Sequence, residues 1–277
     1  GVKKEEQDEA HSLIEEFMLL ANEAVAGHIC NANRPGIFRV HEPPDKQSFE
    51  EFAVFARGLG YQVHTQDISV HEIQNLLERV KDKPEEPIIC INLLRSMKLA
   101  VYGNKNKGHF ALALKFYTHF TSPIRRYPDL IVHRILDQMW AQKHGGNAGA
   151  PLSLSDIGVI AAHSSRMERQ ADDAERELSK IKILQYLAGL AQHHSKRVYN
   201  AIITGVKSFG FFVELEENLV DGVVHLSSIK DDFYDADIPR QTVMGRRRHR
   251  KFRLGQRVEV RIEKVDLAKR QVDFILA

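Results

Sequence analysis

Hydrophobic side chains recur at helical spacing through the first part of the chain. Over residues 8 to 26 this pattern predicts an amphipathic helix, with Leu13, Ile14 and Phe17 on its apolar side and glutamates opposite. Three further helices follow, each ended by glycine or proline, and we interpret them as scaffold. These three are predicted over residues 46 to 58, 70 to 81 and 86 to 99.

Two later helices follow a loop that contains proline. Pro128 suits a first helical position, so a helix is predicted from residue 128 to residue 140. A longer helix is predicted from residue 155 to residue 190, with Ser153 and Asp156 placed to cap its start. Short extended segments are predicted over residues 34 to 44 and 108 to 114.

After residue 195 the hydrophobic period changes from helical to alternating. Five short strands with glycine between them predict a small β-barrel of the OB type. The predicted fold class is therefore α+β, with a mostly helical part and short strands at residues 1–195 and a five-stranded barrel at residues 196–277. The barrel strands are predicted over residues 198 to 206, 211 to 215, 223 to 226, 257 to 265 and 271 to 276.

Composition narrows the class of protein. The chain has 277 residues, of which 43% are hydrophobic and 27% charged, as in soluble globular proteins. No apolar run is long enough to span a bilayer and no signal peptide opens the sequence, so we expect a cytoplasmic protein. We also expect it to be a monomer. Cys30 and Cys90 are far apart, which predicts two buried thiols rather than a disulfide framework or a zinc site. The chain opens at Gly1 without methionine, which indicates a piece of a longer protein.

Positive charge collects near the C-terminus. The net charge is +2, and from residue 196 onward lysine and arginine outnumber aspartate and glutamate, whereas the earlier part is net acidic. A basic run in this region is most simply a solvated loop, but its density favours a polyanionic partner. Its members are Arg246, Arg247, Arg248, Arg250 and Lys251.

The segment from residue 117 to residue 134 carries the most distinctive chemistry. Arg125, Arg126 and Tyr127 lie where a proline-containing loop becomes a helix, and His119 is among the rings nearby in the sequence. Two guanidiniums beside a helix N-terminus, together with aromatic rings, suit a phosphate and a stacked base. The alternative is a buried loop whose arginines cap carbonyls and pair with carboxylates.

The string His-Phe-Thr-Ser-Pro-Ile-Arg-Arg-Tyr-Pro-Asp-Leu, residues 119 to 130, resembles the signature of the ribonuclease II family, whose catalytic module is the RNB domain. Residues 15 to 22 and 108 to 113 resemble that domain as well. The resemblance implies an exoribonuclease of the ribonuclease R type. Such an enzyme needs Mg²⁺ and degrades single-stranded or structured RNA from the 3′ end to nucleoside 5′-monophosphates.

The resemblance also implies roles for individual residues. Arg125 and Arg126 match residues near the scissile phosphate. Glu175, in Ala-Glu-Arg-Glu at residues 174 to 177, matches a glutamate close to the active site, although on its charge pattern alone this stretch is a solvated helix face. In the extended segment over residues 34 to 44, alternation places Arg39 and His41 on one face of a strand. Either residue could contact RNA, and the alternative is a structural pairing role. The residues expected to contact RNA in this part are His119, Tyr127, Arg39 and His41.

Residues 208 to 213 and 221 to 227 closely resemble the S1-type RNA-binding domain. Exposed rings on a barrel face allow bases to stack without sequence preference. The alternative is that the phenylalanines lie in the core, and alternation favours that position for Phe211. The RNA-binding residues implied by the resemblance are Phe209, Phe212, His225, Asp266 and Arg270.

The sequence departs from the family in one respect. No closely spaced aspartate motif such as Asp-x-Asp-Asp, which would hold Mg²⁺, occurs in the chain. The acidic run at residues 231 to 237 lacks the glycine and final glutamate of a calcium loop, so no metal is predicted there. We therefore interpret the chain as the C-terminal part of an RNB domain plus one S1-type domain, which binds RNA but is inactive alone. The alternative is a non-catalytic single-stranded RNA-binding protein that uses the RNB remnant as scaffold.

Overall fold

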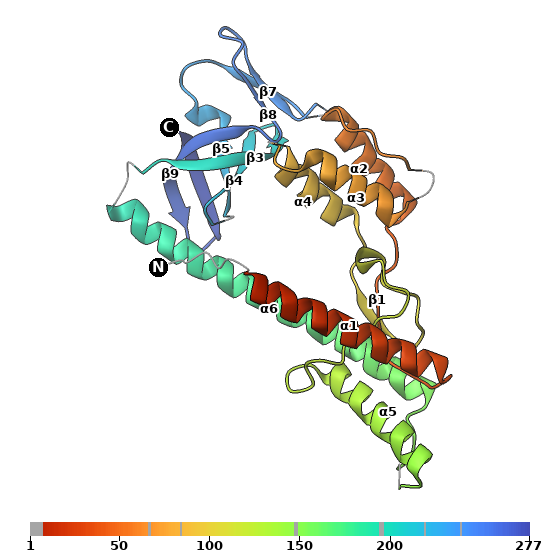
Figure 1. The fold of residues 1–277 in the computed structure, drawn as a ribbon. Coiled ribbons are helices and arrows are strands. Elements are labelled where there is room, and N and C mark those ends of the chain that lie inside the picture. Colours follow the sequence, from red (N-terminus) through yellow and green to blue (C-terminus); the bar gives the residue numbers. More distant parts are fainter. Residues whose placement is uncertain are drawn as a thin grey trace. The chain divides into compact units, whose positions relative to one another are not determined.

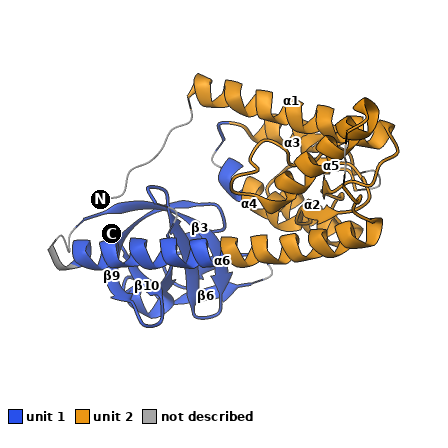
Figure 2. Ribbon diagram, turned by 90° about the horizontal axis from the view of Figure 1, so that it is seen from below, with its two compact units in different colours: residues 1–5, 82–88, 173–277 blue, residues 6–81, 89–172 orange. Residues whose placement is uncertain are grey.

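The computed structural model describes residues 8–65, 68–83, 85–146, 149–193, 197–218, 220–238 and 240–277. These residues form two compact units (Figure 2): a helical unit of residues 6–81 and 89–172, and a barrel unit built mainly from residues 173–277. The mixture of helices and strands confirms the predicted α+β class. The predicted domain boundary between residues 195 and 196 lies outside the described residues.

The first four helices confirm the predicted ones and differ from them only near their ends. Three of them begin at a side-chain cap: the carboxylates of Asp8 and Asp45 and the hydroxyl of Ser69 each accept a backbone N–H of the first turn. The helices are α1 (Glu9–Asn31), α2 (Lys46–Gly58), α3 (Val70–Val80) and α4 (Glu86–Ser96).

The predicted apolar side of α1 is only partly used. Leu13, Ile14 and Phe17 are all more than half exposed, whereas Ala26 and Ile29 near the end of the helix are completely buried. The core that they enter also contains residues of the short strand that follows and of a later helix. The hydrophobic pattern therefore identified the helix correctly, but the first half of its apolar side lies outside the core.

A two-stranded sheet replaces part of what the sequence predicted. Strand β1 (Phe38–Val40) confirms the extended segment, and it pairs antiparallel with β2 (Val101–Gly103), which was not predicted. The strand predicted over residues 108 to 114 is wrong, because a 3₁₀ turn occupies its centre. Gly108 and Ala113 take positive φ values of 76° and 56°, which fold this segment back on itself.

Two long helices complete the helical unit, and both confirm predictions. α5 (Tyr127–His144) has Pro128 in its first turn and ends at Gly145, whose φ of 73° is left-handed. α6 (Leu154–His193) begins with the predicted cap: the hydroxyl of Ser153 accepts the Asp156 amide, and the Asp156 carboxylate accepts the Ser153 amide. The side chains of residues 169–179 of α6 are all exposed.

The barrel unit contains the predicted five-stranded closed barrel, with strand order β10-β5-β4-β3-β9. Its core includes Phe211, Phe274 and Val260, and the last turns of α6 add Leu184 and Leu187 to it. In Figure 1 the strands β3, β4, β5 and β9 lie beside this part of α6. The strands are β3 (Tyr199–Lys207), β4 (Gly210–Leu215), β5 (Asp221–His225), β9 (Arg257–Asp266) and β10 (Gln271–Leu276).

A second, three-stranded antiparallel sheet lies between β5 and β9 in the sequence. The predicted loop in this region is therefore wrong. Its strands have only three or four residues each, and Val243 and Phe252 anchor the sheet in the barrel core. The strands are β6 (Tyr234–Asp237), β7 (Thr242–Gly245) and β8 (Lys251–Arg253).

Both cysteines differ from the prediction. Cys30 and Cys90 are each partly exposed rather than buried. Burial of the partly covered Cys30 thiol still raises its pKa. Among the described residues, no helix combines the length and the apolar composition that a bilayer span requires.

Candidate active site and nucleic-acid interface

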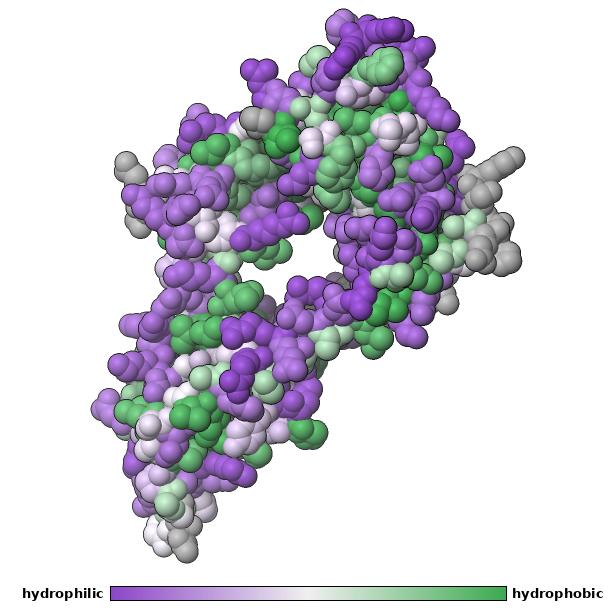
Figure 3. Space-filling view, turned by 180° about the vertical axis from the view of Figure 1, so that it is seen from behind, coloured by the Kyte–Doolittle hydropathy of each residue, from purple (hydrophilic) through white to green (hydrophobic). Residues whose placement is uncertain are grey.

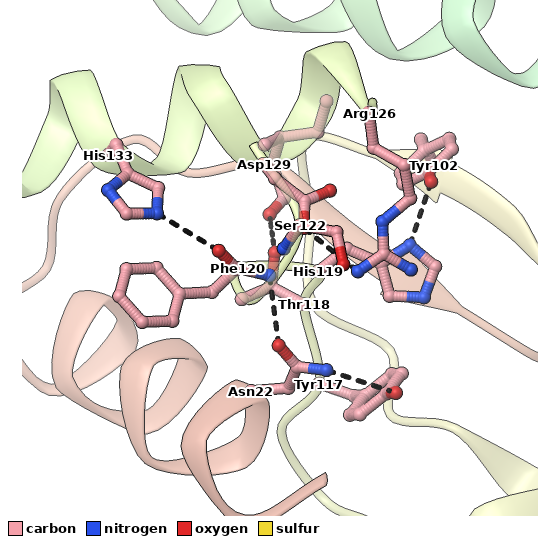
Figure 4. A network of polar contacts seen from close by, with 11 residues as sticks. Asn22, Tyr102, Tyr117, Thr118, His119, Phe120, Ser122, Arg126, Asp129 and His133 are labelled. Atoms are coloured by element: carbon pink, nitrogen blue, oxygen red, sulfur yellow. Dashed lines mark hydrogen bonds and ion pairs between the residues drawn. The ribbon is translucent and has the colours of Figure 1, made fainter. Parts of the chain in front are cut away.

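The loop before α5 is fixed by buried polar side chains (Figure 4). Asn22 of α1 is almost completely buried; its amide oxygen accepts the Phe120 N–H at 2.9 Å, and its amide nitrogen donates to the Tyr117 hydroxyl at 3.4 Å. The Thr118 hydroxyl donates to the Ile37 carbonyl at 2.6 Å. Asn22 was not among the predicted site residues, because a single asparagine within an apolar helical stretch gives no local signal of this contact.

Asp129 fixes the other end of the loop. Its Oδ1 accepts the Ser122 N–H at 2.8 Å and the Arg126 Nη2 at 2.9 Å, and none of its side chain is exposed. Asp129 Oδ2 and Arg126 Nε are buried without a hydrogen-bond partner. His133, one turn further along α5, is hydrogen-bonded through Nε2 to the Phe120 carbonyl at 3.0 Å. For Arg126, the structure therefore matches the alternative that an arginine of this loop pairs with a carboxylate.

Arg125 differs from its neighbour. Its side chain is exposed and has no hydrogen-bond or ion-pair partner within the described part of the chain. Tyr127 begins α5 and is half exposed, with 49% of its surface accessible. Arg125 and Tyr127 are thus available to a ligand at the N-terminus of a helix, where backbone N–H groups favour an anion.

His119 lies within a chain of aromatic and charged groups in the helical unit. Its Nδ1 is hydrogen-bonded to the Tyr102 hydroxyl at 2.8 Å, and the Arg39 guanidinium lies 4.7 Å from the centre of the Tyr102 ring. Arg39 Nη1 is also 2.5 Å from the Glu168 carboxylate. Burial lowers the pKa of His119 to about 3, and the nearby arginines add to this effect. His119 is therefore neutral at physiological pH and acts as a hydrogen-bonding ring rather than as a cation.

His41 is bonded to backbone on both sides of its ring. Its Nδ1 accepts the Ala111 N–H at 3.2 Å and its Nε2 lies 2.8 Å from the Lys98 carbonyl, while its ring stacks on His109 at 5.0 Å. These contacts, like the ion pair between Arg39 and Glu168, match the alternative that His41 and Arg39 have a structural pairing role. Contact of either residue with RNA stays a prediction.

Glu175 belongs to the barrel unit, whereas Arg125 belongs to the helical unit. Glu175 is exposed on α6 and has no partner among the described residues. Its charge pattern alone predicted such a solvated face. Its role near the active site stays a prediction that rests on the resemblance.

Three rings predicted to bind RNA lie together on the barrel. Phe209 is half exposed. The centroid of its ring lies 6.2 Å from that of the Phe212 ring and 5.8 Å from that of the His225 ring. Phe211 is completely buried, which confirms its predicted place in the core. Gly210 permits this arrangement, because a Cβ there would lie 2.3 Å from a carbonyl oxygen of the neighbouring strand. We call Phe209, Phe212 and His225 the ring cluster.

Asp266 and Arg270 bound the β9–β10 turn. The Asp266 carboxylate accepts the Lys269 N–H at 2.9 Å, and this bond holds its pKa below the ordinary value. Arg270 forms an ion pair with Glu177 of α6. No contact joins either residue to the ring cluster in the described structure, so their predicted contact with RNA stays a prediction.

The basic run lies on the β7–β8 turn and on β8 rather than in a long loop. Arg246 donates to both oxygens of Asp235 at 2.7 Å, and Arg250 lies 3.5 Å from Asp231. Arginines thus neutralise two acidic residues of the run at 231 to 237. The other predicted members, which are exposed and make no ion pair with an acid in the described structure, are Arg247, Arg248 and Lys251.

A magnesium site does not fit the residues that the structure describes. No group of three or more histidine, cysteine, aspartate or glutamate side chains lies close enough there to hold a metal ion. This agrees with the lack of an aspartate motif in the sequence.

Comparison with known proteins places this geometry in a family. A family model described as RNB domain matches residues 1–142, and one described as S1 RNA binding domain matches residues 192–276. The chain is 42% identical over 272 residues to a ribonuclease R of Aquifex aeolicus (strain VF5). This match covers 98% of this chain but only 38% of that protein. The chain thus spans well under half of the length of this curated relative.

Solved structures give the same result. The apo form of Mycoplasma genitalium RNase R matches with a TM-score of 0.83 at 26% identity, over 98% of this chain and 42% of that one, and the same enzyme with ribose-methylated single-stranded RNA matches equally well. Yeast Ssd1, described as a pseudonuclease, matches with a TM-score of 0.69 at 22% identity, over 86% of this chain and 29% of that one, which shows the fold alone. The chain belongs to the RNB domain family and carries an S1 RNA binding domain after its RNB region.

Proposed function

We propose that this chain is the RNA-holding C-terminal part of a 3′-to-5′ hydrolytic exoribonuclease of the ribonuclease R type. The observation that carries the proposal is the unpaired, exposed Arg125 on a loop that buried Asn22 and Asp129 hold in place. A guanidinium held in this way can bind a phosphate of RNA without having to order a flexible loop first. Nucleoside 5′-monophosphates are the proposed products and the cytoplasm is the proposed location.

In this proposal each group has a distinct task. Arg125 contacts the phosphate near the scissile bond and offsets the charge that develops there. Arg126 keeps its pairing with Asp129 and thereby maintains the loop, while His119 and Tyr127 shape the pocket. The ring cluster of the barrel stacks bases of the incoming strand, which is worth about 1–3 kcal/mol per base.

The hydrolytic step is proposed to need groups that this chain does not contain. Mg²⁺ would activate water and stabilise the leaving oxygen when bound by aspartates from elsewhere in a longer protein. Glu175 is proposed to orient a water molecule or a metal ligand. The chain alone, as a monomer, is then expected to bind RNA without shortening it.

A second candidate function is a non-catalytic single-stranded RNA-binding protein. It is favoured by the lack of a metal-holding cluster among the described residues and by the occurrence of this fold in a pseudonuclease. The two candidates differ in whether the longer protein hydrolyses RNA at all.

Digestion of a 5′-labelled single-stranded RNA with Mg²⁺, alongside a binding titration without metal, tests the proposal. We expect this chain to bind the RNA without shortening it, and to support stepwise shortening once it is joined to the aspartate-containing region of a relative. If the joined protein binds RNA but never shortens it, the non-catalytic candidate holds. If this chain shortens RNA by itself, our account of the missing metal ligands is wrong.

A further inference from the structure

The small sheet of the barrel unit has one buried and one exposed face. Its inward side chains, such as Val243 and Phe252, lie in the barrel core. On the other face, Asp235 lies opposite Met244, which lies opposite Lys251, and residues opposite one another in neighbouring strands share a face. We call the exposed side the outer sheet face. Its strand residues are Asp235, Asp237, Thr242, Met244, Lys251 and Arg253, and Phe233 lies directly before the first of these strands.

The outer sheet face exposes hydrophobic side chains where a small sheet would normally expose polar ones. Phe233, directly before β6, is 67% exposed, and Met244 is 44% exposed. The Arg247 guanidinium lies 5.9 Å from the centre of the Phe233 ring. A ring and a thioether between cations form a surface on which a flat, unstacked base can lie.

Several cations of this face and of the adjoining β7–β8 turn are free of acidic partners. The two acids of the face have other partners: Asp235 accepts two hydrogen bonds of 2.7 Å from Arg246, and Asp237 lies 3.8 Å from the Arg240 guanidinium. Within the part of the chain that the structure describes, Arg248, Lys251 and Arg253 make no ion pair. At the top of the view in Figure 3, hydrophilic side chains predominate and some hydrophobic ones lie between them.

The Asp232 carboxylate fixes the β7–β8 turn through hydrogen bonds to its backbone. Its Oδ2 accepts the backbone N–H groups of Arg247 and Arg248 at 2.8 and 2.7 Å, and its Oδ1 accepts the N–H of Phe233 at 2.7 Å. Gly245 makes room for this carboxylate, because a Cβ there would lie 2.6 Å from Oδ2. The turn therefore presents its arginines from a fixed backbone, which lowers the entropy cost of binding.

We propose that the outer sheet face is a second contact surface for single-stranded RNA, separate from the ring cluster. Phe233 stacks on a base, and Arg248, Lys251 and Arg253 bind phosphates. Unpaired RNA is the partner that fits, because it offers negative charge together with accessible base faces, whereas bases of a duplex are already stacked. The inference rests on the proposed RNA binding and extends it to a site outside the S1-type ring cluster.

The test uses the whole chain and the fluorescence anisotropy of a labelled single-stranded RNA oligonucleotide, with an abasic oligonucleotide of equal length as the second probe. We expect Phe233→Ala to weaken binding of the normal RNA about fivefold or more and to leave abasic binding unchanged, since stacking contributes about 1–3 kcal/mol per base. Phe233→Tyr keeps a ring and is expected to restore binding.

The charges are tested by salt dependence. The double variant Lys251→Gln with Arg253→Gln is expected to reduce the slope of log affinity against log salt by about 0.7 for each lost phosphate contact. The matched control is Arg197→Gln with Arg257→Gln, which removes the same charge from residues that pair with Glu217 and Glu216. The control is expected to keep the wild-type slope.

Three outcomes would overturn the inference while leaving RNA binding intact. These are wild-type affinity in Phe233→Ala, equal losses for the normal and abasic probes, and equal slopes for the charge variant and its control. In each case, a loss of affinity in Phe209→Ala with Phe212→Ala would show that the ring cluster still binds RNA. If the wild-type chain fails to bind RNA even at low salt, the proposed function itself fails.

Discussion

The Arg126 guanidinium donates to Asp129 Oδ1 over 2.9 Å, and the Asp129 side chain is completely buried. Arg126 is itself mostly covered, with 23% of its side chain exposed. The neighbouring Arg125 has no such partner in the described structure. Two adjacent arginines of one motif therefore have opposite expected effects when they are replaced.

Arg126→Ala should destabilise the fold. It leaves the buried Asp129 carboxylate without its cation, and breaking such a pair costs about 2–4 kcal/mol of unfolding free energy when one partner is partly exposed. Urea unfolding followed by circular dichroism measures this loss. Adding Asp129→Asn to the variant removes the unpaired charge and should recover part of the stability. A wild-type midpoint for Arg126→Ala would contradict the structural role.

Arg125→Ala should leave the unfolding free energy unchanged and weaken RNA binding. One lost phosphate contact lowers the salt slope by about 0.7 for a single strand. Arg125→Lys keeps the charge but loses the planar fork, so we expect it to keep the slope and to lose affinity. In an active parent enzyme the alanine variant should lower turnover by about tenfold or more, since a positioned donor to developing charge is lost. Unchanged turnover would exclude the catalytic role of Arg125.

Neighbouring phenylalanines on β4 should separate binding from stability. Phe212 and Phe209 belong to the ring cluster, so replacing both with alanine should weaken RNA binding by about 1–3 kcal/mol for each stacked base. The unfolding free energy should change little. Phe211 is completely buried, so Phe211→Ala should cost about 3–5 kcal/mol of stability. Calorimetry and a binding titration on the same samples measure both effects. Equal effects of Phe211→Ala and Phe212→Ala on stability would contradict the assigned faces.

Acid should destabilise the helical unit through His119. Burial lowers its pKa from the ordinary 6.5 to about 3, so the unfolded chain binds a proton at a higher pH than the folded one. The stabilisation is complete above about pH 6.5 and is lost progressively as the pH falls toward 3. His119→Gln removes this titration and should flatten the dependence of unfolding free energy on pH between 7 and 5. The same slope in both proteins would show that other groups cause the acid sensitivity.

Elements with strong local signals were predictable from the sequence. The helices have caps such as Asp8 and Asp45 and apolar residues at helical spacing. In the barrel strands, hydrophobic and polar residues alternate, and glycines separate one strand from the next. β2 and the strands of the small sheet were not predictable, because three or four residues carry too little periodicity. Their strand structure depends on partners far away in the sequence, such as the pairing of Tyr102 with Arg39.

The candidate site was predictable in its membership but not in its pairing. The sequence identified Arg125 and Arg126 together, yet only the fold shows that Asp129 reaches back to the second and not to the first. The same holds for the basic run, where Asp235 selects Arg246 and leaves Lys251 exposed. Such choices depend on which acidic group the backbone brings within hydrogen-bond distance, and sequence spacing does not determine that distance.

The exposed stretch of α6 at residues 169–179 has a consequence for local stability. In the described structure, backbone hydrogen bonds of the helix and surface ion pairs stabilise it, such as Asp173 with Arg176 and Glu177 with Arg270. In contrast, Leu184 and Leu187 anchor the last turns in the barrel core. Local opening should therefore be easiest in the middle of this helix. Amide hydrogen exchange should be fast there and slow on either side, so that one continuous helix behaves as two cooperative segments joined by a weakly protected one.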